Sequence, residues 1–287
     1  MVSSNLSDSL WLHWHAHPEV LIGTILIQTA YLLGVGPIRG KFNLSDSHAP
    51  QQTFYFSTGV LLIFLSLSSP LHILSDDYLF SAHMLQHVII TLISPPLLII
   101  GTPNWLIEPI FRNKLILKIF KLIFNPIVAI ILFNFVFSIW HIPSLYALSV
   151  KYHWAHVTEH FLFVIAALIM WWPLCSQITY IPKLIYPLQM MYLFVMSLAQ
   201  VIVFGIVTFA SDPIYSHYVD APRIWNINPL VDQQIGGIIM KVGSGFLFLA
   251  LLIIAFFKWA SISEQNEHID PKNGIIGDSQ TIRRRYE

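Results

Sequence analysis

Long apolar segments alternate with short polar connections along this chain. Seven segments are about 18 to 25 residues long and nearly free of charge, and a helix of that length crosses roughly 30 Å of hydrocarbon. We therefore predict an all-α polytopic membrane protein, a bundle of seven transmembrane helices. The predicted spans are residues 19–36, 52–69, 78–101, 123–140, 154–173, 186–210 and 234–259.

This pattern divides the chain into three parts. Residues 1–17 are expected to form a histidine-containing tail outside the cytoplasm, residues 18–260 the seven-helix membrane domain, and residues 261–287 a polar cytoplasmic tail. Most prolines lie just outside the predicted spans, where a missing backbone N–H does least harm. Pro95 and Pro96 are the prolines that lie farthest inside a predicted span, and they predict a kink or break in the inner half of the third span.

Composition supports a membrane protein and narrows its chemistry. Of the 287 residues, 55% are hydrophobic and only 10% are charged, against about a quarter in an ordinary domain. The formal net charge of zero gives no reason to expect a nucleic-acid partner. The apolar composition predicts that membrane lipid surrounds the helices. The single cysteine, Cys175, excludes a disulfide or a thiolate cluster within one chain. A bound metal would therefore take nitrogen, oxygen or thioether ligands.

The distribution of basic residues predicts the orientation. Connections that would lie on one side of the membrane contain twelve Lys and Arg residues, whereas those on the other side contain two, Lys151 and Arg223. Because positive charge accumulates in cytoplasmic loops, we expect the N-terminus outside and the C-terminus in the cytoplasm. Lys241 lies inside the seventh span, where it could reach outward to the interface or pair with an acid such as Asp232 or Glu159.

Most histidines fall at the predicted outer end of the bundle. Imidazole is the commonest metal ligand, and its unperturbed pKa lies near neutrality. This concentration of imidazoles therefore indicates metal handling or proton chemistry. The outer set comprises His13, His15, His17, His72, His83, His87, His141, His153, His156, His160 and His217.

Two pairs within this set have the spacing of a metal site. His83 and His87 are four residues apart, as are His156 and His160, so each pair shares one helix face. Both pairs begin within two turns of the outer boundary, and together they offer four nitrogens, enough for copper or zinc. The alternative is that these histidines lie at the membrane interface and hydrogen-bond to backbone or lipid headgroups.

The second pair also fits the H-x-x-E-H pattern of one class of zinc hydrolases. In that pattern two histidines bind zinc and the glutamate, here Glu159, is the general base. Asp232 or Glu19 could supply a third ligand, although Asp232 also suits the cap of the last span. His141 follows Trp140 at the outer end of the fourth span, which is typical of an interfacial belt as well as of a site.

Six motifs in order resemble one protein family. They are His83-Met84-x-x-His87, Ser94-Pro95-Pro96-Leu97 followed by Gly101-x-Pro103, Trp140-His141-x-Pro143, His156-x-x-Glu159-His160, Trp171-Trp172-Pro173 and Asp232-Gln233-Gln234-x-Gly236-Gly237. Together they resemble the CtaG family of bacterial cytochrome c oxidase assembly factors, the multi-span kind linked to caa-type oxidases. The resemblance covers about residues 15 to 260, nearly all of the membrane part. Lys241 departs from the apolar or aromatic residue that this family leads us to expect, so it receives no role.

The resemblance implies a protein of the bacterial inner membrane that serves the respiratory chain. It would help to assemble a haem–copper oxidase, with oxidase subunits or their assembly intermediates as partners, and would be neither a subunit nor an enzyme.

Our leading hypothesis is a copper site at His83, His87, His156 and His160, with zinc as the alternative metal. His141, Glu159 and Asp232 would be further ligands or would hold the ligands in place. A metal-dependent hydrolase, a haem-binding electron carrier and a scaffold without metal remain as alternatives.

Overall fold

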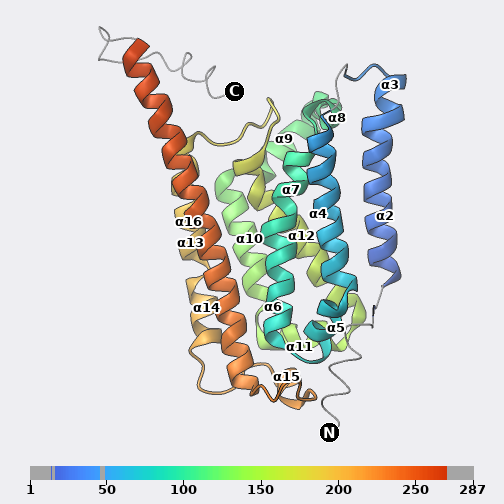
Figure 1. The fold of residues 1–287 in the computed structure, drawn as a ribbon, viewed down its shortest axis with the longest axis vertical. Coiled ribbons are helices and arrows are strands. Elements are labelled where there is room, and N and C mark those ends of the chain that lie inside the picture. Colours follow the sequence, from blue (N-terminus) through green and yellow to red (C-terminus); the bar gives the residue numbers. More distant parts are fainter. Residues whose placement is uncertain (1–13, 15–16, 46–48, 270–287) are drawn as a thin grey trace.

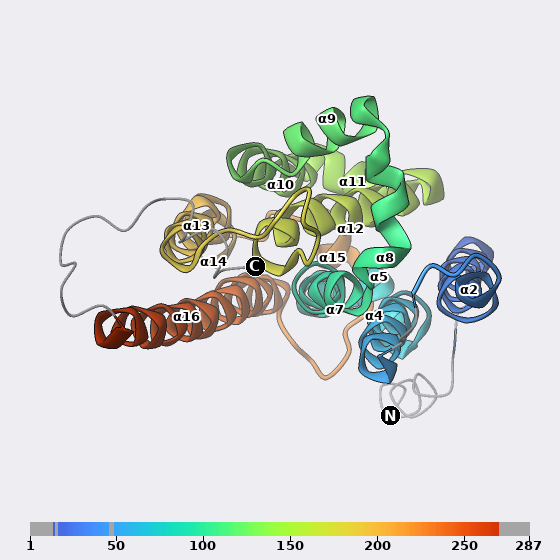
Figure 2. The same ribbon diagram turned by 90° about the horizontal axis from the view of Figure 1, so that it is seen from above.

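The chain folds as a bundle of helices. The computed structural model describes residues 14, 17–45 and 49–269, with side chains up to residue 265, and this part of the chain contains no strand. The long helices run roughly parallel (Figure 1). Seen from above, α12 lies inside the bundle, α2 stands at one edge and α16 at the other (Figure 2). The predicted all-α class is confirmed.

The helices have the following bounds. The first half contains α2 (Pro18–Leu33), the π-helix η1 (Gly34–Ile38), α3 (Arg39–Lys41), α4 (Pro50–Ser68), α5 (Pro70–Asp77), α6 (Phe80–Val88), the π-helix η2 (Ile89–Ile93), α7 (Ser94–Gly101), α8 (Asn104–Ile107), the 3₁₀-helix η3 (Glu108–Arg112) and α9 (Lys114–Ile123). The second half contains α10 (Pro126–Trp140), α11 (Pro143–Lys151), α12 (His153–Cys175), α13 (Tyr186–Ala199), α14 (Val201–Thr208), α15 (Ser216–Asp220) and α16 (Pro229–Ile269).

Five helical segments in the described residues are long and apolar enough to cross a membrane. They are Pro18–Lys41, Phe80–Gly101, His153–Cys175, Tyr186–Thr208 and Pro229–Gln265. Two further pairs of helices, α4 with α5 and α9 with α10, raise the number to seven if each bent pair is one span. The described residues therefore contain five to seven candidate membrane spans. Each of the seven predicted spans overlaps one of them.

The two bent pairs differ from the prediction in one respect. The predicted loop after the second span is the helix α5, which bends by 46° from α4. The helix α9 turns away from α10 by 62°. It carries three lysines on one face and exposed leucine and isoleucine side chains on another, as helices lying along a membrane interface do.

The connections separate into two sets at opposite ends of the bundle. One end holds α5, α11 and α15, and we call it the histidine end; the other holds α3, α8 and α9 (Figure 1). The connections rich in Lys and Arg lie at this second end, as the predicted topology requires. By the positive-inside rule the histidine end faces away from the cytoplasm, which remains a prediction.

The helical break predicted at Pro95 and Pro96 is present as a change of helix type. The π-helix η2 ends immediately before α7, whose first turn holds both prolines. Proline has no N–H, so the carbonyl four residues before Pro95, that of Thr91, loses its usual partner. The indole N–H of Trp171 on α12 donates to this carbonyl at 2.8 Å. Trp171 of one motif thus donates to the backbone carbonyl that loses its partner because of Pro95 in another motif.

Two glycines allow helices to approach closely. A Cβ on Gly101 of α7 would lie 2.4 Å from the backbone nitrogen of Phe56 on α4. A Cβ on Gly236 of α16 would lie 2.5 Å from the ring of Phe80, the first residue of α6. These close approaches leave no room for a side chain, so the two glycines set the spacing between α4 and α7 and between α6 and α16.

Aromatic and aliphatic side chains fill the space between the helices. Phe133 and Phe137 of α10, Phe163 and Met170 of α12, and Met196 of α13 are almost completely buried. Large apolar side chains also cover the outside of α2, α13, α14 and α16. An apolar exterior beside a packed interior is typical of helices surrounded by lipid.

We expect Trp171→Phe to destabilise the bundle, because it removes the donor to the Thr91 carbonyl and leaves that buried group unpaired. The cost of an unsatisfied buried group is about 1–3 kcal/mol. Thermal unfolding of the detergent-solubilised protein measures it.

Trp172→Phe is the matched control, because the Trp172 indole nitrogen has no hydrogen-bond partner among the described residues. Equal losses in the two variants would contradict the role given to the Trp171 bond.

Candidate metal centre

The first turn of α6 is fixed from across the bundle. Asp232 of α16 accepts hydrogen bonds from the backbone N–H groups of Phe80 (2.6 Å) and Ser81 (3.2 Å), and from the Ser81 hydroxyl. A carboxylate at a helix N-terminus satisfies free N–H groups and the helix dipole. His83 and His87 follow one and two turns later, so Asp232 sets the position of the helix that carries them.

Three imidazoles meet in a buried group that we call the triad. His83 and His87 come from α6 and His160 from α12, and one ligand nitrogen of each lies within 4.8 Å of the others. Their ring centroids are 4.3 to 6.0 Å apart. All three side chains are buried, with His83 and His87 each 1% exposed. Three of the four predicted ligands are therefore close enough to share one ion.

The ring nitrogens of the triad are unusually poor in partners. Both nitrogens of His83, both of His87 and Nε2 of His160 are buried without a hydrogen-bond partner among the described residues. Buried polar groups in native proteins are nearly always paired, since leaving one unpaired costs free energy. A cation coordinated by the lone pair of each neutral ring would satisfy three of these five nitrogens.

Glu159 places a carboxyl group beside the triad. It precedes His160 on α12 and is 1% exposed, and its Oε1 lies 3.8 Å from Nε2 of both His83 and His87. A carboxylate there would offset the charge of a cation held by neutral imidazoles. The structure thus places this predicted residue at the centre of the site.

His141 lies at the edge of the triad, with its ring centroid 6.3 Å from that of His87. Its Nδ1 is 2.7 Å from the Phe137 carbonyl, and because a carbonyl only accepts, Nδ1 carries the proton. Nε2 is therefore the basic nitrogen, and burial lowers the pKa of His141 to about 4. The ring is neutral at pH 7, but it does not join the group of three.

His156, the fourth predicted ligand, belongs to a neighbouring group. Its Nε2 lies 3.4 Å from Oδ2 of Asp76, and Nε2 of His72 lies 3.5 Å from the same oxygen. We call His72, Asp76 and His156 the middle group; its ligand atoms also lie within 4.8 Å of one another. The ring of His156 is still 4.4 Å from that of His160, so the two groups adjoin.

Sequence reasoning missed the middle group because it assigned His72 to a loop. In the structure this residue lies on α5 with Asp76 four residues later, on the same helix face. The spacing was visible in the sequence, but it carries meaning only once the segment is known to be helical.

A third group lies nearer the surface. His17, Glu19 and His153 have ligand atoms within 4.8 Å of one another, and His153 Nε2 is 2.7 Å from Glu19 Oε1. We call it the outer group. His13 and His15 of the predicted tail lie outside the described residues, as does His48. The side chain of His217 bonds to the backbone carbonyl of Asp76 at 2.6 Å.

Three tyrosines pack beside the triad and were not foreseen. The ring centroid of Tyr146 lies 5.3 Å from that of His83, and its hydroxyl is 2.6 Å from that of Tyr218. Tyr215 donates to the carbonyl of His141 at 3.0 Å. Burial raises the pKa of Tyr146 well above its usual value, so the phenol stays protonated. No sequence motif marks these residues, since their contacts join α11 to the segment around α15.

Two residues of the last span have structural rather than ligand positions. The carboxylate of Asp232 caps α6. The cap of α16 itself is Asn228, whose Oδ1 accepts a hydrogen bond from Leu230 N at 2.9 Å. The helix begins at Pro229, earlier than predicted. Lys241 donates to the carbonyl of Ser197 on α13 at 2.8 Å, not to Asp232 or Glu159.

The comparisons with known proteins give one match. The family described as cytochrome c oxidase caa3 assembly factor (Caa3_CtaG) matches residues 29–261, which is most of the chain. No curated protein and no solved structure gives a significant match.

We expect Asp232→Asn to lower the unfolding temperature without removing a metal ligand. The amide keeps one acceptor for Phe80 but loses the charge and the second acceptor, and loss of a helix cap costs about 0.5–2 kcal/mol. Thermal unfolding and metal content of the purified variant check both parts, with the exposed Asp220→Asn as control. A variant as stable as the parent that binds no metal would make Asp232 a ligand instead.

Proposed function

The chain belongs to the family of cytochrome c oxidase caa3 assembly factors, and we propose that it serves assembly by holding copper at His83, His87 and His160. Copper is here a cargo for the oxidase, bound near the histidine end and passed on by ligand exchange. Oxidase subunits or their assembly intermediates, with their own copper ligands, would be the acceptors.

The observation that carries this proposal is the set of five buried ring nitrogens without partners in the triad. Imidazoles that served only packing would be expected to hydrogen-bond to backbone or to each other. The rings of the triad lie beside one another, and Nε2 of His83 and of His87 both lie 3.8 Å from one carboxylate oxygen of Glu159. This arrangement supports the proposal that the three rings are ligands.

The distances suit one ion after small side-chain movements. Two ligands at ~2.1 Å from a tetrahedral ion lie ~3.4 Å apart, and the triad's nitrogens lie within 4.8 Å. Movements of about 1 Å or less, within the freedom of histidine side chains, would close the site. Histidine nitrogens bind copper more strongly than zinc at a given geometry, which favours copper as the cargo.

The hydrolase alternative receives less support from this geometry. The H-x-x-E-H pattern requires His156 and His160 to bind the same ion, with Glu159 acting on a water. Here His160 belongs to the triad and His156 to the middle group. Glu159 lies beside two of the proposed ligands, where its charge would stabilise the bound cation.

We expect the His83→Ala, His87→Ala, His160→Ala triple variant to lose tight copper binding, because it removes all three proposed ligands. Copper bound per purified protein, measured by mass spectrometry after dialysis against a competing chelator, is the readout. In cells that depend on this protein, the oxidase should lose copper and activity.

The control is Asn134→Ala, which removes a partly buried polar side chain of α10 that bonds to the Ile130 carbonyl. The copper site should survive this change. A triple variant that folds and binds copper as tightly as the parent would refute the copper site. A Soret band in the parent protein would support haem binding instead.

A further inference from the structure

We propose that His72, Asp76 and His156 form a second metal site, through which a divalent copper ion passes from the outer end of the protein to the triad. This inference rests on the proposed copper site, because it supplies that site's access route. The outer group of His17, Glu19 and His153 marks where the route opens.

The first argument is the convergence of three donor atoms on one point. Nε2 of His72 and Nε2 of His156 approach the same oxygen, Oδ2 of Asp76, at 3.5 and 3.4 Å. The spacing is longer than a good hydrogen bond. It equals the ~3.4 Å that separates two ligands of one tetrahedral ion when each bond is ~2.1 Å.

The second argument is that these atoms are buried and unpaired. Nε2 of His72 and Nε2 of His156 have no hydrogen-bond partner among the described residues, and the two side chains are only 4% and 11% exposed. The side-chain amide nitrogen of Gln86 donates to Nδ1 of His72 at 3.2 Å, and this contact fixes the ring with Nε2 toward Asp76.

The third argument is the continuity of imidazoles between the groups. The ring of His156 lies 4.4 Å from that of His160 and 6.3 Å from that of His83, both members of the triad. On the other side the ring of His72 lies 4.9 Å from that of His17. An ion could therefore move between groups by exchanging one ligand at a time, without leaving a shell of nitrogen and oxygen donors.

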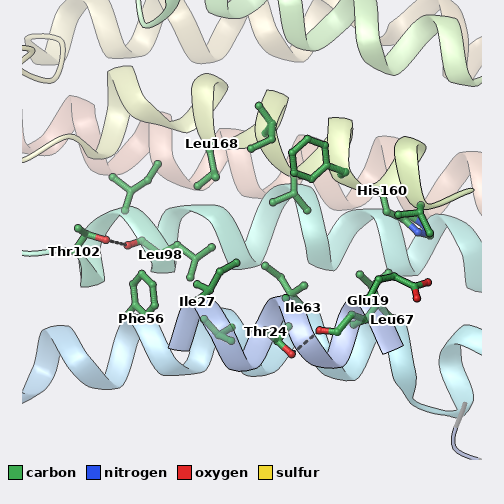
Figure 3. A pocket seen from close by; sticks show the side chains of 18 of the residues that line it. Glu19, Thr24, Ile27, Phe56, Ile63, Leu67, Leu98, Thr102, His160 and Leu168 are labelled. Carbon is green, nitrogen blue, oxygen red and sulfur yellow. Dashed lines mark hydrogen bonds between the residues drawn. The ribbon is translucent and has the colours of Figure 1, made fainter. Parts of the chain in front are cut away.

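A cavity borders residues of all three groups. It has a volume of about 630 Å³ and lies between α2, α4, α7 and α12, and its wall includes members of all three groups: His17, Glu19, His72, His153, His156 and His160. Glu19 and His160 lie at the same end of this cavity, whereas Phe56 and Thr102 lie at the other (Figure 3).

Exposure falls steadily along the series of groups. The side chain of His153 in the outer group is 58% exposed, that of Asp76 in the middle group 29%, and that of His83 in the triad 1%. Each step inward thus removes the ion further from water, as expected of a route that ends in a buried site.

The donor set selects the charge state of the ion. A carboxylate favours a divalent ion over Cu(I), and imidazole suits copper. The middle group combines one carboxylate with two imidazoles, whereas the triad offers imidazoles with the Glu159 carboxylate at 3.8 Å. We therefore assign Cu²⁺ to the middle group, and no change of oxidation state is needed for the transfer.

The test compares Asp76→Asn with Asp77→Asn, a matched change of the neighbouring acid on α5. Loss of a residue that only orients a ligand already costs ~10- to 100-fold in metal affinity, so loss of a ligand should weaken the second site at least ~10-fold. The probe is Cu²⁺ buffered with glycine, followed by equilibrium dialysis and by electron paramagnetic resonance.

We expect the full-length protein to bind two equivalents of Cu²⁺, the second more weakly, with spectral broadening from the nearby pair of spins. Asp76→Asn should bind one tight equivalent and fill the triad at least ~10-fold more slowly in stopped-flow mixing. Asp77→Asn should behave as the parent. The His72→Ala, His156→Ala double variant should reproduce Asp76→Asn.

The outcomes separate the two proposals. A single tight equivalent, lost in the triad variant and filled at the parental rate in Asp76→Asn, would overturn the second site and leave the proposed function standing. Binding that survives the triad variant but not Asp76→Asn would support the second site and refute the triad as the copper site. Absence of Cu²⁺ binding in the parent would overturn both.

Discussion

The structure depends on the cost of burying imidazole nitrogens where water cannot reach them. In a low-dielectric interior an unpaired polar group is expensive, and the triad gathers several such groups between α6 and α12. The packing of the surrounding helices must therefore offset the free energy that these imidazoles would gain from hydration. Phe163, Tyr146 and the other aromatic side chains around the triad form the surrounding wall. The unpaired nitrogens that could bind an ion therefore lower the stability of this end of the bundle.

Several polar contacts far apart in the sequence hold this wall in place. Asp232 fixes the start of α6, and Trp171 satisfies the carbonyl released before Pro95, so the helix that bears His83 and His87 is fastened on both sides of the site. Neither residue is in the triad. Both residues support one interrupted helix, so a motif next to the candidate metal centre need not contain candidate ligands.

The length of the apolar segments predicted the helical class and the segments that became α2, α4, α10, α12 and α16, because apolar length is a local property of the sequence. Helical spacing also predicted that His83 lies beside His87. It could not show that His160 would join them while His156 turned to Asp76, because this depends on how α12 is rotated against α5 and α6. The same limit applies to Asp232, whose sequence position suggests a cap for its own helix although its carboxylate reaches another. Pairings between helices are decided by packing, which a single sequence does not encode locally.

The adjacency of His156 and His160 on one helix has a kinetic consequence for any ion that arrives. Two divalent cations held in neighbouring groups repel strongly through a medium with little screening. Occupation of the middle group would then weaken the hold of the triad on its own ion, as in the knock-on exchange of ions between adjacent channel sites. A deep site can in this way bind tightly when supply is scarce and still release its cargo when another ion follows.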